Sequence, residues 1–484
     1  MKPHERQAAH SVEKIGGTSM SNYAAVRDNI ILRPRNGSLY QRVFVVSAYG
    51  GVTDQLLEDK KNGRPGIYAL FAGAPHERNW REALLDLRCH FERINAGLFK
   101  EPQQLASANT FIGERLLDAE DRLGDLDRLC RHANFERQDH LDTVREMLAS
   151  LGEAHSAWNM AQLLRGEGLA ARFVDLTAWH DRTRLDLDER IRCAFAGIDL
   201  SKELPIVTGY AHSREGLMRT FARGYSEMTF SRIAVITEAS EGIIHKEYHL
   251  SSADPRLVGE QRTVPIGRTN YDVADQLANL GMEAIHPKAA KGLRQREIPL
   301  RVMNSYQPEH SGTLITSNYV SEKPRVEIIA GRKSVFALEC FDQEMMDCVT
   351  RYDRVIDDII EHYSGTVVTK DTNANTITHF LADSIETVER IRNAIGEHYS
   401  TCDIQVRKVA VVSAIGSNMD VPGMLPQALT ALARSGIDVL AVHQPMRQVD
   451  IQFVVGESDY ENTVVILHRT LVENCEYSQT VCAA

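Results

Sequence analysis

Val12–Asn22 reads V-E-K-I-G-G-T-S-M-S-N, and the rest of the chain can be interpreted outward from this stretch. A short strand pattern ends in two glycines and two hydroxyl residues, and a helical pattern begins directly after them. Such a turn directs backbone N–H groups and a helix N-terminus toward one point, which suits a polyphosphate. Lys14 adds a point charge beside them. Alone the motif is weak, and its weight comes from four further segments.

Length and composition indicate a folded chain of several domains. The 484 residues suggest about three domains at roughly 150 residues each, and 43% apolar residues can build a sizeable core. A formal net charge of −11 argues against a nucleic-acid partner held by a general positive field. The polar first ten residues and the lack of a long apolar run predict neither a signal peptide nor a membrane segment. Eight scattered cysteines without a C-x-x-C pair are typical of reduced thiols, so we expect a cytoplasmic protein.

The first 315 residues alternate short β-branched runs with longer helical stretches. The strand candidates are Arg42–Ser47, Ala171–Asp175, Pro205–Thr208 and Arg232–Thr237. Near-continuous apolar strands between helices predict an α/β fold with a mostly parallel sheet covered on both faces. Residues 60–150 are rich in charge and poor in strand patterns, which predicts a helical insertion within a first domain at 1–316.

A second pattern begins after a linker at Ser317–Pro324. Strands, a helix and strands follow one another twice, which predicts two small α+β ferredoxin-like modules at about 325–400 and 404–475. The stretch Val326–Cys340 is expected to give two strands of the first module. Neither module carries an obvious catalytic constellation.

Two further segments carry hydroxyl and carboxylate groups at predicted turns. Val45–Asp54 runs from a buried strand into Ser47, two glycines and Thr53, all able to meet a ligand closely. The alternative is an ordinary strand-turn-helix with Thr53 as helix N-cap. Leu151–Ser156 is expected to open a helix, with Glu153 in the first turn. There the carboxylate either stabilises the helix dipole or receives a substrate amino group.

The last two segments add cations. Phe221–Thr229 offers Arg223, able to grip a carboxylate or phosphate with two hydrogen bonds, followed by Ser226 and Glu227. Gly281–Pro287 precedes Lys288 and Lys291, and for this segment taken alone a helix with a solvated basic face is the favoured explanation of these lysines. His245 and His249 are four residues apart, but without a patterned acidic or Cys partner we predict no metal ligands in the chain.

These turns point to phosphoryl transfer. They sit where strands end and helices begin, and open α/β sheets bind ligands at that edge. Cations aimed at anions, with hydroxyls and carboxylates nearby, suit phosphoryl transfer better than hydride or acyl transfer. The sequence contains neither a Walker motif nor a G-x-S-x-G nucleophile elbow, which disfavours P-loop and α/β-hydrolase enzymes.

At these residues the chain resembles the aspartate kinases of the amino-acid kinase superfamily. K-I-G-G-T-S resembles the family's K-F-G-G-T-S, and V-V-S-A-Y-G-G-V-T-D resembles V-V-S-A-x-G-x-x-T-(D/N). The family's order continues over nearly the full length with L-G-E-x-x-S-A, R-G-x-S-(D/E), A-D-P-R, G-x-x-x-x-H-P, I-P-L-R-V-x-N-S and G-T-L-I. The subgroup that supplies ectoine synthesis is the most similar.

The resemblance implies a fold, a reaction and partners. The fold is a three-layer α/β/α kinase domain followed by two ACT domains. The reaction is ATP-dependent phosphorylation of the side-chain carboxylate of L-aspartate to 4-phospho-L-aspartate, with Mg²⁺ bridging the phosphates. The product would feed lysine, threonine and methionine, or ectoine. ACT domains imply an amino-acid effector and a homodimer or higher homo-oligomer.

The resemblance also implies roles for single residues. Lys14 would neutralise the transferring phosphate, and Glu227 stands where the family has an Asp, so both are expected to be catalytic. Arg223 would hold the α-carboxylate of aspartate and Glu153 its ammonium. Further aspartate contacts are implied for Ser47, Thr53 and Ser226. Nucleotide contacts are implied for Gly16, Gly17, Thr18, Ser19, Thr237, Glu238, Asp254, Arg256 and Lys288.

Three departures from the family leave other functions open. Tyr225 replaces the second glycine of R-G-G-S, and T-D-V-D-G becomes Thr237–Gly242. The family's nucleotide lysine aligns with Glu283, so Lys288 is expected to take over its work. A kinase for another carboxylate, such as glutamate, is the first alternative. A non-catalytic ACT-type amino-acid sensor on a kinase scaffold is the second.

Overall fold

The chain folds into two compact units. The computed structural model describes residues 9–35, 37–59, 63–73, 77–131, 135–181, 183–221, 224–282, 284–420 and 422–473. One unit comprises Met1–His249 with Ile285–Ser317, and the other comprises Leu250–Ala284 with Asn318–Ala484. We call them unit 1 and unit 2.

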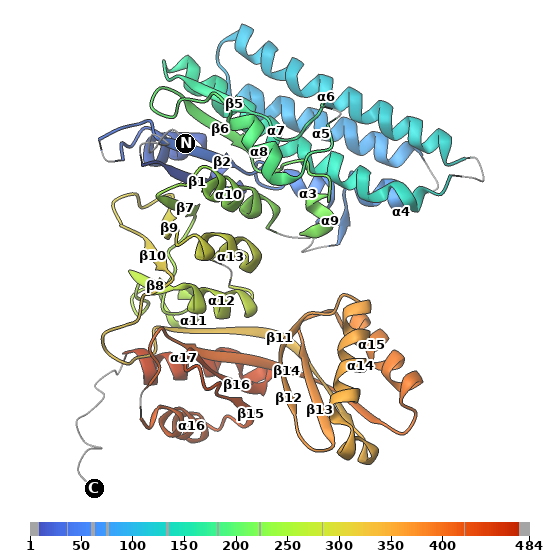
Figure 1. Ribbon diagram of the computed structural model, residues 1–484, viewed down its shortest axis with the longest axis vertical. Coiled ribbons are helices and arrows are strands. Elements are labelled where there is room, and N and C mark those ends of the chain that lie inside the picture. Colours follow the sequence, from blue (N-terminus) through green and yellow to red (C-terminus); the bar gives the residue numbers. More distant parts are fainter. Residues whose placement is uncertain are drawn as a thin grey trace, which may run out of the picture. The chain divides into compact units, whose positions relative to one another are not determined.

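A mostly parallel sheet forms the centre of unit 1 (Figure 1). Its strands follow the order β5-β6-β2-β1-β7-β9-β10, and β10 alone of these runs antiparallel to its neighbour. β2 and β6 are buried along their whole length because their apolar side chains face helices or other strands on both sides. The predicted α/β fold is therefore confirmed. The strands span Ser11–Ile15 (β1), Arg42–Val46 (β2), Ala171–Val174 (β5), Leu204–Thr208 (β6), Glu241–Lys246 (β7), Leu300–Asn304 (β9) and Thr313–Thr316 (β10); Glu58–Asp59 (β3) and Arg64–Pro65 (β4) form a separate pair.

Helices pack against this sheet and against each other. The long helices α5 (Glu77–Leu98), α6 (Pro102–Leu129) and α7 (Leu141–Gly166) lie side by side and make the 60–150 region helical (Figure 1). α7 also contacts β2, β5 and β6, and α10 contacts β1, β2 and β7. The other helices of unit 1 are α1 (Gly17–Met20), α2 (Tyr23–Val26), α3 (Val52–Leu56), α4 (Ile67–Gly73), α8 (Leu187–Phe195), α9 (Leu217–Thr220), α10 (Tyr225–Ile236) and α13 (Pro287–Gln295).

Three of the four predicted strands are confirmed, and one is wrong. Arg232–Thr237 is not a strand, because α10 continues to Ile236 and Thr237 is its C-cap. The strand lies further along the chain, as β7. This shift moves the sheet edge from Thr237 to the residues that follow Lys246.

Unit 2 is built on one antiparallel sheet in the order β12-β13-β11-β14-β16-β15. β11 and β14 pair from Ile328 opposite Ile415 to Phe341 opposite Asp403, so the two predicted modules share a single sheet. Val326–Cys340 was expected to give two strands, but it gives most of one long strand with a bulge between Arg332 and Val335. The elements are α11 (Pro255–Val258), β8 (Arg268–Asn270), α12 (Tyr271–Asn279), β11 (Ile328–Phe341), α14 (Val349–His362), β12 (Val367–Thr372), β13 (Thr376–Leu381), α15 (Ile385–His398), β14 (Asp403–Ile415), α16 (Met424–Arg434), β15 (Val439–His443), β16 (Asp450–Gly456) and α17 (Tyr460–His468).

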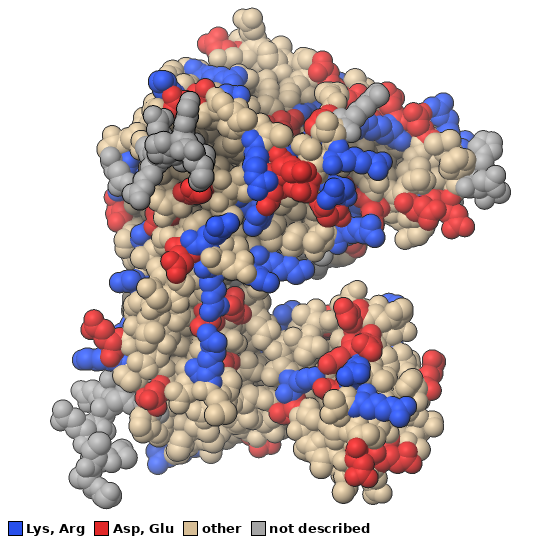
Figure 2. Space-filling view, in the orientation of Figure 1, with Lys and Arg blue, Asp and Glu red and all other residues tan. Residues whose placement is uncertain are grey.

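The surface carries both signs of charge. On the face in Figure 2, Lys and Arg side chains are interspersed with Asp and Glu side chains in each unit. None of the helices in the described ranges is long and apolar enough to cross a bilayer.

Candidate active site

Four parallel strands of unit 1 end at one edge of the sheet. β2 and β7 flank β1, and β6 flanks β2, all in parallel register. The residues that follow these strands are Gly16, Ser47, Gly209 and Glu247. The turns predicted around Gly16 and Ser47 are therefore brought together at the carboxyl edge, where open α/β sheets bind ligands.

The first two turns pack against each other closely enough to require glycine. A Cβ on Gly17 would lie 2.7 Å from the carbonyl oxygen of Ala48, closer than real contacts allow. The backbone N–H of Gly50 donates a hydrogen bond to the Ser21 hydroxyl at 2.9 Å. Thr18 is exposed at the start of α1, so its backbone is accessible to a ligand.

Ser19 is already bound by a carboxylate. Its backbone N–H and its hydroxyl both donate to Oε1 of Glu247, each at 2.9 Å. A phosphate that used the Ser19 N–H would have to displace Glu247. The sequence reasoning missed Glu247, because the strand before it was placed nine residues too early.

Lys14 and Glu227 form the charged centre of this edge. Lys14 Nζ lies 3.5 Å from Glu227 Oε1, and both side chains are about nine-tenths buried. The other oxygen of Glu227 accepts the backbone N–H of His286 at 2.6 Å. Burial alone would raise the pKa of Glu227, but Lys14, Lys246 and the His286 N–H outweigh it and hold the pKa below its usual value. Glu227 is therefore an anion paired with Lys14.

Lys246 is a second cation that sequence reasoning missed. It is the last residue of β7. Its charge and the charge of Lys14 both lower the pKa of Glu227. Residues paired in parallel strands share a face, so Lys246 lies on the same face of the sheet as Ile244 and its partner Lys14.

Glu153 is buried within electrostatic reach of Lys14. Glu153 lies in the middle of α7, which begins at Leu141. The expectation that Glu153 lies in the first turn of a helix, where the helix dipole would favour its charge, is therefore wrong. Its Oε1 accepts the Tyr225 hydroxyl at 2.7 Å, while its buried Oε2 accepts no hydrogen bond from the described part of the chain. Burial raises the pKa of Glu153 to about 7, against the lowering effects of Tyr225, backbone N–H groups and Lys14.

Two predicted aspartate-binding residues surround Glu153. A Cβ on Gly209 would lie 3.0 Å from Cβ of Ser226 and 3.2 Å from Cγ of Glu153, so these two residues meet at the end of β6. The Thr53 side chain is near enough to Tyr225 to lower the pKa of its hydroxyl, although burial outweighs this effect. Thr53 is not the helix N-cap, because Gly51 has that position.

Arg223 lies outside the described residues, so its predicted role stays a prediction. Gly224, which follows it, has a φ of 75° and caps α10. A Cβ there would lie 2.8 Å from Cβ of His286 and 2.9 Å from its ring, which explains why glycine is needed. Glu283 also lies outside the described residues.

The predicted nucleotide residues Thr237, Glu238, Asp254, Arg256 and Lys288 belong to several different elements of the two units. Thr237 and Glu238 precede β7, so they lie at the amino edge of the sheet, where Thr237 bonds to His10 at 2.9 Å. Their predicted place beside the phosphate turn is wrong. Asp254 and Arg256 belong to unit 2 and pair with each other at 2.7 Å. Lys288 is exposed, with Nζ 5.1 Å from the centre of the Phe221 ring.

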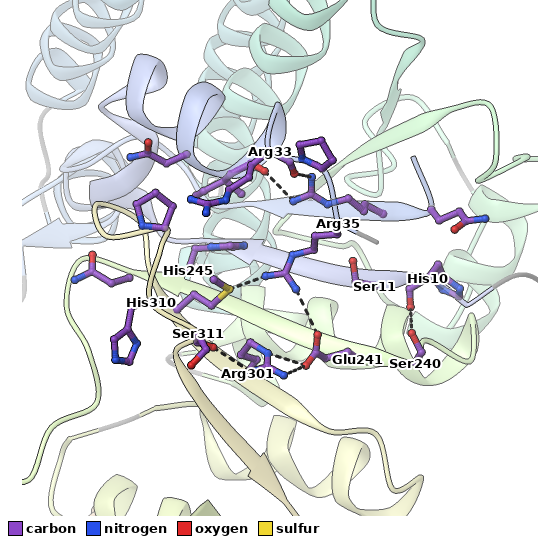
Figure 3. A pocket seen from close by; sticks show the side chains of 18 of the residues that line it. His10, Ser11, Arg33, Arg35, Ser240, Glu241, His245, Arg301, His310 and Ser311 are labelled. Carbon is purple, nitrogen blue, oxygen red and sulfur yellow. Dashed lines mark hydrogen bonds and ion pairs between the residues drawn. The ribbon is translucent and has the colours of Figure 1, made fainter. Parts of the chain in front are cut away.

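The amino edge of the same sheet holds a charged cavity of about 420 Å³ (Figure 3). Arg301 pairs with Glu241 at 2.8 Å and donates to the Ser311 carbonyl, while Arg35 reaches Glu241 at 3.4 Å. Arg33 pairs with Glu309 outside this group. Arg301 and Arg35 therefore share the carboxylate of Glu241, and this cavity lies at the edge of the sheet opposite Lys14 and Glu227.

One group of metal-type side chains occurs in the described residues. Asp353, Asp357 and His379 of unit 2 lie within 4.8 Å of one another through their ligand atoms. The Lys370 ammonium bonds to both carboxylates, at 2.7 and 3.0 Å, and already supplies the positive charge that this cluster needs.

Comparison with known proteins agrees with the site. The amino acid kinase family model matches residues 11–304, which include every strand that forms the carboxyl edge. The chain belongs to the amino acid kinase family. It is 51% identical over 98% of its length, and over the whole of the relative, to the aspartate kinase Ask_Ect of Stutzerimonas stutzeri. The expected membership of the aspartate kinases, and the similarity to an ectoine-type member, are confirmed.

Solved structures of aspartate kinases share the fold of this chain. Escherichia coli aspartokinase III in complex with aspartate and ADP matches with a TM-score of 0.71 at 20% identity, covering 96% of this chain and 99% of that one. The same enzyme in complex with lysine and aspartate gives a TM-score of 0.71 at 21% identity. At these identities the likeness concerns the fold of the kinase chain, including its C-terminal modules.

Proposed function

We propose that the kinase transfers the γ-phosphoryl group of ATP to the side-chain carboxylate of L-aspartate, giving 4-phospho-L-aspartate and ADP. The observation that carries this proposal is the position of Lys14. It contacts Glu227 at 3.5 Å, and its charge also lowers the pKa of the buried Glu153. A phosphate-binding turn and a receptor for an ammonium group therefore lie within electrostatic reach of one lysine.

The acceptor needs positioning more than activation. An aspartate side chain is already anionic at neutral pH, so no general base has to remove a proton before its oxygen attacks phosphorus. Glu153 receives the ammonium through its unpartnered Oε2, and Ser47, Thr53 and Ser226 offer hydroxyls around it. Arg223 is proposed to hold the α-carboxylate. Lys14 neutralises charge on the transferring group, which together with positioning supplies most of the acceleration.

The phosphate turn suits a magnesium nucleotide. Gly16, Gly17 and Thr18 present backbone at the edge of the sheet, and the carboxylates of Glu227 and Glu247 flank that turn. Oxygen ligands of this kind, completed by phosphates and water, are those that Mg²⁺ prefers. Glu227 and Glu247 are the residues that would hold the ion, which when bound would neutralise charge on the phosphates. Asp254 and Arg256 remain proposed nucleotide contacts, whereas Lys288, whose side chain is exposed, is a weaker candidate than Lys246.

The C-terminal modules are proposed to be regulatory. The assignments of 1–316 to the kinase domain and of 325–400 and 404–475 to ACT modules are part of this proposal. ACT modules would bind an amino-acid effector and join copies of the chain into a homodimer or higher homo-oligomer. The product would feed lysine, threonine and methionine, or ectoine.

Trapping the acyl phosphate tests the reaction directly. Purified protein with Mg-ATP, aspartate and hydroxylamine should give aspartate hydroxamate, because hydroxylamine attacks acyl phosphates. A reaction without ATP is the control. Hydroxamate from glutamate but not from aspartate would favour the alternative carboxylate kinase. The absence of product from both amino acids would favour the non-catalytic sensor.

A pair of lysine variants tests which residue replaces the family's nucleotide lysine. Lys246→Ala should raise the KM for ATP about tenfold, because Lys246 is half-buried and acts on Glu227 beside the phosphate turn. Lys288→Ala should change that KM less than about twofold, because an exposed ammonium contributes little. Saturation curves for ATP measure both. The reverse order of effects would assign the work to Lys288.

A further inference from the structure

Tyr225 stands where aspartate kinases usually have a glycine, and the structure gives its hydroxyl a partner. It donates to Oε1 of Glu153 at 2.7 Å, from the first residue of α10 to the middle of α7. Tyr225 does not adopt a positive φ, whereas the preceding Gly224 does. The backbone therefore accepts a large side chain at 225 without strain, and glycine is not needed there.

The hydroxyl is a donor throughout the neutral range. Burial, and the nearby Glu153, raise the pKa of Tyr225 well above its ordinary value. A Tyr O–H that faces a carboxylate and cannot ionise favours the charged form of that carboxylate. Tyr225 accordingly lowers the pKa of Glu153, which burial has raised to about 7.

A second contact of the same kind lies on the same helix. Glu146 and Glu153 lie two turns apart on one face of α7, and each accepts a tyrosine hydroxyl. Tyr210 bonds to Glu146 at 2.6 Å, and the rings of Tyr210 and Tyr225 meet edge to face at 6.1 Å. The other oxygen of Glu146 accepts hydrogen bonds from two backbone N–H groups of α9, so both of its lone pairs are used.

Glu153 differs from Glu146 in one respect. Its Oε2 is fully buried and accepts no hydrogen bond within the described ranges, although a buried acceptor without a partner is costly. Because Tyr225 holds Oε1, the carboxylate cannot rotate to exchange its two oxygens without losing that bond. The oxygen left over has a fixed direction.

We propose that Tyr225 is a positioning residue for the acceptor amino acid: its hydroxyl holds Glu153 so that Oε2 is presented to the acceptor's ammonium group. This inference rests on the proposed function. It predicts that Tyr225 contributes to aspartate affinity in a way that depends on whether Glu153 is charged.

The test is Tyr225→Phe, which keeps the ring and removes the hydroxyl. The KM for aspartate at pH 7 should rise about tenfold, the lower end of what a hydrogen bond to a charged group contributes. The pKa of Glu153 should rise, so the acid limb of the aspartate kcat/KM profile should move to higher pH, and the difference from wild type should narrow toward pH 9. The KM for ATP and kcat at saturating aspartate should stay within about twofold, since the hydroxyl does not touch the phosphate turn.

Tyr210→Phe is the matched control. It removes an equivalent hydroxyl from Glu146, so any change in aspartate saturation should be the same at every pH. Two results would overturn the inference. In the first, the pH profile of kcat/KM for aspartate is the same in Tyr225→Phe and wild type from pH 6 to 9. In the second, kcat falls and the KM values for aspartate and ATP rise by the same factor at every pH.

Binding separates this inference from the proposed function. Calorimetric titration of aspartate without ATP should show the same pH-dependent loss in Tyr225→Phe. If wild type forms no aspartate hydroxamate but its aspartate binding shows this loss, the reaction is wrong and the role of Tyr225 stands. If wild type forms the hydroxamate and the loss is absent, the reaction stands and the role of Tyr225 is wrong.

Discussion

Replacing Lys14 by alanine should lower kcat about 10³-fold, the effect of removing one preorganised charge from a phosphoryl-transfer site. Lys14 is nine-tenths buried and has Glu227 3.5 Å away, so water cannot replace its ammonium efficiently. The KM for aspartate should change less than kcat, because Glu153 receives the acceptor and Lys14 acts on Glu153 only by lowering its pKa. Initial rates of hydroxamate formation at saturating ATP and aspartate measure the loss.

Two further variants make the Lys14 result specific. Lys14→Arg keeps the positive charge and should recover part of the rate. Lys14→Met keeps a side chain of similar length without the charge and should have the same low kcat as Lys14→Ala. Removing the ammonium also takes away a group that lowers the pKa of Glu227. A Lys14→Ala enzyme with wild-type kcat and a raised KM for aspartate would contradict the role assigned to Lys14.

The turns around Lys14 were predictable from sequence because their chemistry is local. A strand, two glycines and two hydroxyls within Val12–Asn22 determine where the backbone turns, and a Cβ at position 17 would lie only 2.7 Å from the carbonyl oxygen of Ala48, so the turn requires glycine there. The antiparallel sheet of unit 2 was predicted as two modules, but local patterns did not indicate that β11 and β14 pair along their whole lengths.

The prediction of the nucleotide-binding residues was wrong because one segment of the sequence was ambiguous. The segment R-I-A-V-I-T is apolar and β-branched, which fits a strand and a buried helix equally well. Packing decides for the helix, as α10 contacts three strands of the sheet. The strand was then placed too early, so Thr237 and Glu238 were chosen and Lys246 and Glu247 were missed.

Glu153 was found for a partly wrong reason. Leu151–Ser156 was expected to open a helix, yet Gly152 lies within α7, where a Cβ would come 2.6 Å from Cβ of Ala48. The glycine is there to let the helix approach the second turn. That approach buries Glu153 and raises its pKa, which no local pattern reveals.

Replacing Glu13 by glutamine should destabilise the fold by about 3–5 kcal/mol, the loss expected when one partner of a buried ion pair is removed. Glu13 neighbours Lys14 but faces the opposite side of β1, where it is fully buried. It accepts Arg42 Nε at 2.6 Å and Nη2 at 3.0 Å, and its second oxygen bonds to His245 at 2.8 Å. The pair thus joins β2, β1 and β7, the strands that carry the site, and chemical denaturation monitored by circular dichroism measures the change.

A second substitution and pH identify the cause of the Glu13 effect. Glu241→Gln, at a partly exposed ion pair with Arg301, should change stability by about 1 kcal/mol or less. Burial raises the pKa of Glu13, but Arg42 and His245 outweigh it and leave the pKa well below the ordinary value. Such a carboxylate stabilises the fold above its unfolded pKa, about 4.3, and loses this contribution as the pH falls toward its folded pKa. The difference between wild type and Glu13→Gln should therefore be constant near neutrality and shrink below about pH 4. A difference that stayed constant to lower pH would mean that shape, and not charge, accounts for the loss.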